Sequence, residues 1–78
     1  MIEVNNNLGK KYISALIKKY EAEIAEAEAN LELYMNSLVA IGEHSDLLEE
    51  HVKWIEKYTN AKDHLETVNN LFTQKNNG

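Results

Sequence analysis

The chain contains no cysteine, no proline and no arginine, and each absence excludes a class of structure or function. Without cysteine there is no disulfide and no zinc finger, which fits a reducing compartment. Without proline, no helix is forced to break by a missing backbone N–H. Without arginine, the residue best suited to bidentate phosphate and base contacts, direct binding to nucleic acid is not expected. The missing arginine and the ten asparagines also hint at an AT-rich gene, such as one from a phage or a low-GC bacterium.

Long hydrophobic runs are absent as well. The longest purely apolar run is Leu38 to Ile41, which is too short to cross a bilayer, and residues 1–7 do not resemble a signal peptide. We therefore expect a soluble, cytoplasmic protein that makes no contact with a membrane. At 78 residues there is room for one domain. A domain of this size buries only about 60% of its unfolded surface, so oligomerisation is a common way to stabilise it.

The chain does contain two stretches in which mostly apolar residues recur at alternating steps of four and three. This heptad spacing places them on one stripe of an α-helix, and such a stripe is a surface for another helix. The first set is Ile13, Ile17, Tyr20, Ile24, Ala27, Leu31, Tyr34, Leu38 and Ile41. The second set is Leu47, His51, Trp54, Tyr58, Ala61, Leu65, Val68 and Phe72. We call these residues the seam.

The two seam segments predict two helices in a single domain covering residues 1–78. Helix one is expected at about 7–41, a turn at 42–45, helix two at about 46–73 and a polar tail at 74–78. Asn7 is expected to cap helix one, Gly42 to end it, and Ser45 or Asp46 to cap helix two. One continuous helix is the alternative, but extending the first frame beyond Ile41 soon brings polar residues onto the seam. The prediction is therefore an all-α, antiparallel two-helix hairpin of the coiled-coil type.

Folding the two helices together predicts a register in which facing residue numbers sum to 85. This register sets Leu31 against Trp54 and Tyr20 against Leu65. Each alanine of the seam then faces a large residue, as close packing requires. A slip by one heptad is the next choice.

Apolar residues outside the seam predict a further interface, because contiguous exposed apolar patches usually mark one. Near the turn they are Met35, Val39, Leu48, Val52 and Ile55, with Leu33 beside them. At the other end they are Leu8, Tyr12, Leu16 and Leu71. We expect the first five to hold two hairpins together as a homodimeric four-helix bundle. A site for a helix of a different, unidentified protein is the alternative.

His51 faces Tyr34 in this register, and the pair is expected to form a polar layer in the core. A hydrogen bond between the two is favoured over a pH-sensitive switch. Glu43, His44 and His51 lie near the turn, but no histidine of the chain has a glutamate three residues before it, as di-iron bundles require. No metal ion and no other cofactor is expected.

The net charge of −5 raises a further alternative. Glutamates at 21, 23, 26, 28 and 32 suggest an acidic, DNA-mimic-like inhibitor that titrates a nucleic-acid-binding partner, encoded for example by a phage. These residues fan around the helix instead of forming one row, which favours an ordinary solvated surface. The three serines belong to no recognisable catalytic arrangement and there is no glycine-rich phosphate loop, so an enzyme is not expected. The sequence thus favours a small non-catalytic protein–protein interaction module: an adaptor, scaffold or regulator.

Overall fold

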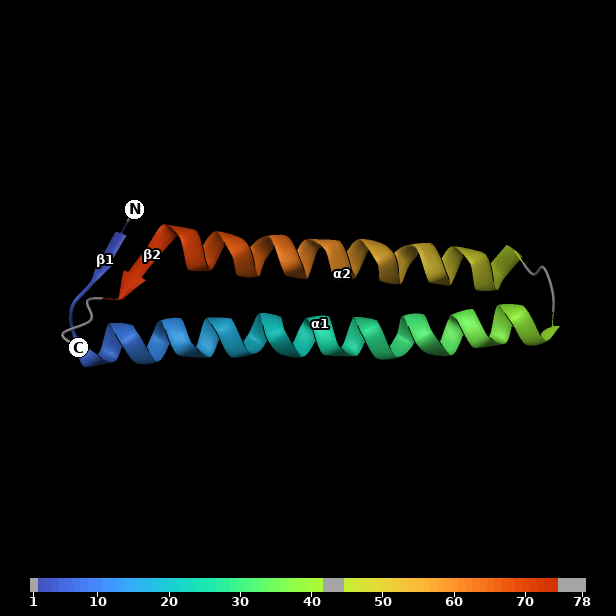
Figure 1. Ribbon diagram of the computed structural model, residues 1–78, viewed down its shortest axis with the longest axis horizontal. Coiled ribbons are helices and arrows are strands. Elements are labelled where there is room, and N and C mark those ends of the chain that lie inside the picture. Colours follow the sequence, from blue (N-terminus) through green and yellow to red (C-terminus); the bar gives the residue numbers. More distant parts are fainter. Residues whose placement is uncertain (1, 42–44, 75–78) are drawn as a thin grey trace.

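A computed structural model of the chain describes residues 2–41 and 45–74, with the side chains of 38–41, 45, 73 and 74 left out of that description. The elements follow the order β1 (Ile2–Val4), α1 (Asn7–Ile41), α2 (Ser45–Leu71) and β2 (Phe72–Gln74). The two helices lie side by side and antiparallel, in a rod of 55 × 18 × 17 Å (Figure 1). The helical hairpin predicted from the sequence is confirmed. The expected cap at Gly42, the rest of the turn at 43–44 and the tail at 75–78 lie outside the described residues.

The seam forms the contact between the helices. Every seam residue whose side chain is described is buried or half-buried, and Ala27 and Ala61 are almost completely covered, at 0% and 1% exposure. The Tyr20 ring lies 5.2 Å from the His64 ring across the two helices, and Ile13 and Phe72 line one groove. Both pairs agree with a register whose facing numbers sum to about 85. A slip by one heptad would move such partners apart by about 10 Å.

The N-terminus of α1 is capped by Asn6. Its side-chain Oδ1 accepts a hydrogen bond from Gly9 N at 2.6 Å, and its backbone oxygen accepts one from Lys10 N at 3.0 Å. The expectation that Asn7 is the cap was therefore wrong by one residue. Residues 5–7 are all asparagine and therefore equivalent in chemistry, and the structure places Asn6 at the cap position.

Two short strands depart from the sequence expectation. β1 and β2 pair in parallel at the end of the rod opposite the turn, with Ile2 opposite Phe72 and Val4 opposite Gln74 (Figure 1). The predicted second helix runs to about residue 73, whereas α2 ends at Leu71. From Phe72 onward the backbone is extended and pairs with β1 instead of continuing the helical ladder. Three residues per strand are too few for an alternating pattern to reveal them in the sequence.

Candidate interaction surfaces

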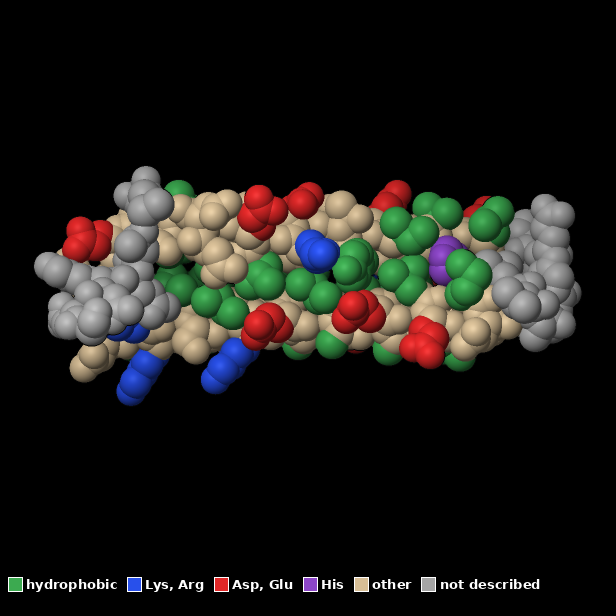
Figure 2. Space-filling model, viewed as in Figure 1, with side chains coloured by type: hydrophobic (Ala, Val, Ile, Leu, Met, Phe, Trp, Pro, Cys, Tyr) green, Lys and Arg blue, Asp and Glu red, His purple; other side chains and the backbone are tan. Residues whose placement is uncertain are grey.

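An apolar stripe near the turn interrupts the polar exterior of the hairpin. It consists of Met35, Leu48, Val52 and Ile55, which are 44 to 50% exposed. Each follows a seam residue by one position, and in an antiparallel pair such positions lie on the same side of both helices. Figure 2 shows hydrophobic side chains gathered on this face over α2 near the turn. We call these four residues the turn-proximal stripe. The side chain of Val39, expected to belong to it, lies outside the described residues.

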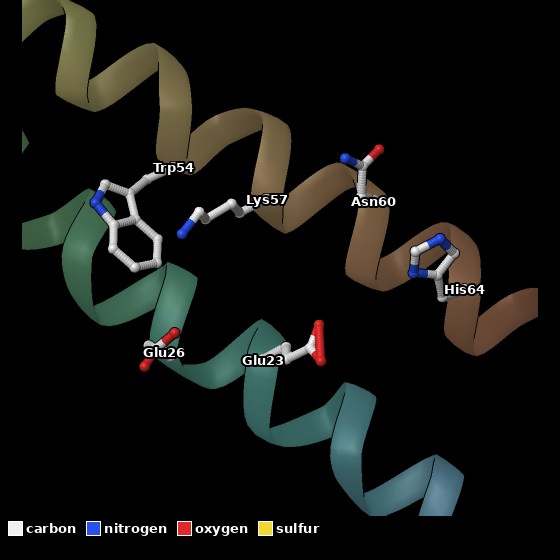
Figure 3. Close-up of a pocket in the computed structure, with 6 residues that line it drawn as sticks. All are labelled: Glu23, Glu26, Trp54, Lys57, Asn60 and His64. Carbon is white, nitrogen blue, oxygen red and sulfur yellow. The ribbon is translucent and has the colours of Figure 1, made fainter.

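A polar groove of about 360 Å³ lies on the opposite side of the hairpin. Most of its lining residues precede a seam residue by one position, which places them across the seam from the turn-proximal stripe. They are Glu23 and Glu26 of α1, and Trp54, Lys57, Asn60 and His64 of α2. Figure 3 shows the Lys57 side chain extending toward Trp54, whereas the Glu23 side chain on α1 extends the other way, toward the His64 end of the groove. The two sides of the hairpin therefore differ in chemistry.

Most of the charge in the polar groove is already engaged within the chain. Lys57 Nζ lies 4.5 Å from the centroid of the Trp54 ring, a cation–π distance. Lys19 Nζ donates a hydrogen bond of 2.6 Å to Glu23 Oε2, and this bond raises the pKa of Lys19 above its usual value. Because the pair is solvent-exposed, it contributes little to stability. Lys57 and Glu23 of the groove therefore each already have a partner within the chain.

A third surface lies at the strand end. An apolar groove of about 460 Å³ opens between β1 and the first turns of α1, with Phe72 beside them; its lining is Val4, Asn6, Leu8, Gly9, Tyr12, Ile13 and Phe72. Leu8 and Tyr12 are strongly exposed, at 79% and 66%. The sequence points to apolar residues at this end, including Leu16 and Leu71, but not to the groove, because β1 forms one of its walls. Leu16 is half-buried and Leu71 is 39% exposed.

Tyr34 of α1 and His51 of α2, the expected polar layer, are both half-buried. His51 Nδ1 is completely covered and has no hydrogen-bond partner. No hydrogen bond from Tyr34 reaches this nitrogen. A buried nitrogen without a partner costs free energy, because it has lost its bond to water. His51 therefore lowers the stability of the contact between the two helices.

The structure describes residues 2–41 and 45–74. In these ranges, no three histidine, aspartate or glutamate side chains lie close enough together to hold a metal ion. No helix there is both long and apolar enough to cross a membrane. The chain matches no protein-family model, no curated protein and no solved structure.

Proposed function

We propose that the protein is a non-catalytic helix–helix interaction module, an adaptor, scaffold or regulator, that self-associates through the turn-proximal stripe into a four-helix bundle. The observation that carries the proposal is the exposure of Leu48, Val52 and Ile55 on one side of α2, with Met35 on the same side of α1. An apolar surface that spans two helices is complementary to the same surface on another hairpin.

The accessible surface of the hairpin supports this proposal. The chain exposes 5861 Å², whereas a compact monomer of 8.9 kDa exposes about 4,800 Å². The difference of about 1,000 Å² is close to the area of about 800 Å² that one partner contributes to a stable interface. Only Ile13, Ala27, Ala61 and Val68 form a buried hydrophobic core in the described residues. A second hairpin would supply the missing core.

Self-association would leave the polar groove and the strand end free. In such a module, the bundle holds its outer surfaces rigidly, and each surface is present in two copies, one from each chain. A partner protein would then meet two copies of one surface, which raises avidity without a new kind of contact. This is a scaffold's mode of action and requires no reactive group.

Light scattering after size exclusion, over a dilution series, tests the proposal. The wild-type chain should have twice the mass of one chain, and Ile55→Asp should shift it to a single chain, since a buried carboxylate has no partner there. Ala22→Asp is the matched control, because Ala22 is exposed and lies away from the seam. Leu48→Gln is a milder second variant, and circular dichroism reports whether each variant is still helical. A wild-type monomer at every concentration, or a dimer unaffected by both stripe variants, would refute the proposal.

A further inference from the structure

We infer that two hairpins pack with their turns at the same end, about a two-fold axis that runs along the rod, so that α1 of each copy lies on α2 of the other. The inference rests on the proposed self-association and adds its geometry. We call the position of a residue along the long axis of the rod its height. A rotation about that axis leaves every residue at its own height. A residue of α1 in one copy therefore meets the α2 residue of the other copy that stands at the same height in the hairpin.

Heights follow from the register, in which facing residues have numbers that sum to about 85. Met35 stands at the height of Leu48 and Val52, so the turn-proximal stripe of one copy covers the turn-proximal stripe of the other. Apolar surface thus meets apolar surface from both helices. Farther from the turn, the same rule brings charged residues together.

Four charged residues on the stripe side of the seam form two complementary pairs. Glu21 stands at the height of Lys62, and Lys18 at the height of Glu66. All four side chains are exposed, and none makes an ion pair in the described part of the chain. Lys62 Nζ instead lies 5.3 Å from the centroid of the Tyr58 ring. In the inferred dimer, Glu21 meets Lys62 of the other copy and Lys18 meets Glu66, twice each by symmetry.

Other two-fold arrangements lose one of these matches. If the hairpins run in opposite directions and overlap along their whole length, the turn-proximal stripe falls on the strand-end half of the other copy, where it meets charged residues such as Lys18 and Glu66. If they overlap only at their turn halves, the four charges extend beyond the overlap and less surface is covered. Only the arrangement with both turns at one end matches apolar with apolar and acid with base. It also places the β1–β2 pairs of both copies at one end of the bundle.

Mixing two charge-reversed variants tests the predicted contacts. Glu21→Lys alone sets the new lysine against Lys62 of the other copy, and Lys62→Glu alone sets two glutamates together, so each homodimer should be weakened. In a mixture, the two variants can form a heterodimer. Both of its contacts between position 21 of one chain and position 62 of the other join a lysine to a glutamate. Native mass spectrometry should then show heterodimer well above the random proportion of about one half. Contacts between residues 21 and 62 inside one chain are identical in homodimer and heterodimer, so they do not affect this ratio. A random proportion at low salt would overturn the inference.

Spin labels measure the direction of packing independently. Ala15, Ala22 and Ala29 are exposed, are spaced by one heptad and lie away from the seam, and the chain has no native cysteine to remove. With the turns at one end, the label-to-label distance should be nearly the same at all three positions. With the hairpins reversed, the axial separation of the two labels would change by about 21 Å from one position to the next. A dimer with such a gradient overturns the geometry alone, whereas a wild-type monomer refutes the proposed self-association as well.

Discussion

The rings of Tyr20 and His64 lie 5.2 Å apart and are inclined by 55°, which joins α1 to α2 in the half of the rod nearer the strands. His64 precedes the seam residue Leu65, so its ring covers the edge of the seam where Tyr20 enters it. Tilted ring pairs at this distance are favourable, because the edge of one ring meets the face of the other. The contact also reports the register of the hairpin.

We predict nuclear Overhauser effects between the ring protons of Tyr20 and His64. At this centroid separation several proton pairs lie within range. A slip by one heptad would replace His64 by Lys57 or Leu71 at that position, and the effects would disappear. Cross-peaks from Tyr20 to either of those residues in place of His64 would contradict the register.

Ala27→Leu should destabilise the protein by about 1 to 3 kcal/mol, because Ala27 is completely covered and a larger side chain forces the helices apart. The matched control is Ala29→Leu, two residues away on the exposed side of α1, which should change the free energy of unfolding by less than about 0.5 kcal/mol. Urea unfolding at one fixed protein concentration measures both. Equal effects of the two variants would mean that Ala27 is not between the helices.

His51→Leu should stabilise the protein, by about 1 to 3 kcal/mol, because it removes a buried nitrogen that has no hydrogen-bond partner. Tyr34→Phe should have almost no effect, since no hydrogen bond joins Tyr34 to this nitrogen. Thermal unfolding at one fixed pH and protein concentration compares the two variants. A loss of stability in both variants would instead indicate that the two side chains form a bonded polar layer.

Gly9→Ala should loosen the strand pair. A Cβ at this position would lie 2.8 Å from Val4 Cγ1 and 3.2 Å from Asn6 Oδ1, so β1 would have to move away from α1. Alanine is the better helix former by about 1 kcal/mol, but that advantage is smallest in the first turn, where the clash occurs. Hydrogen exchange should become faster at the amides of residues 2–4 while the centre of α1 stays protected.

The double variant Val4→Ala with Gly9→Ala supplies the control for this clash. Removing the Val4 methyl groups makes room for the new Cβ, so the second substitution should cost less in the Val4→Ala background than in the wild type. Additive effects, or strand amides that exchange at the wild-type rate in Gly9→Ala, would contradict the proposed close approach.

The sequence alone was enough to predict the hairpin and its contact surface, because both follow from a local rule. Steps of four and three place residues such as Tyr20 and Ile24 on one stripe of a helix, and a helix must bury such a stripe. The same rule predicts that Leu48, Val52 and Ile55 lie beside the seam, where the structure shows them exposed. Their use as an interface stays a prediction.

The strand pair and the two grooves depend on residues that are far apart in the chain, so they follow only from the tertiary structure. Ile2 meets Phe72 only because the hairpin returns the chain to its starting end, and this pairing ends α2 at Leu71 and builds the apolar groove beside Tyr12. The polar groove likewise exists because Glu23 and Lys57 arrive on one side from different helices. Neither surface has a signal within a single segment, since each is made by the antiparallel return of the chain.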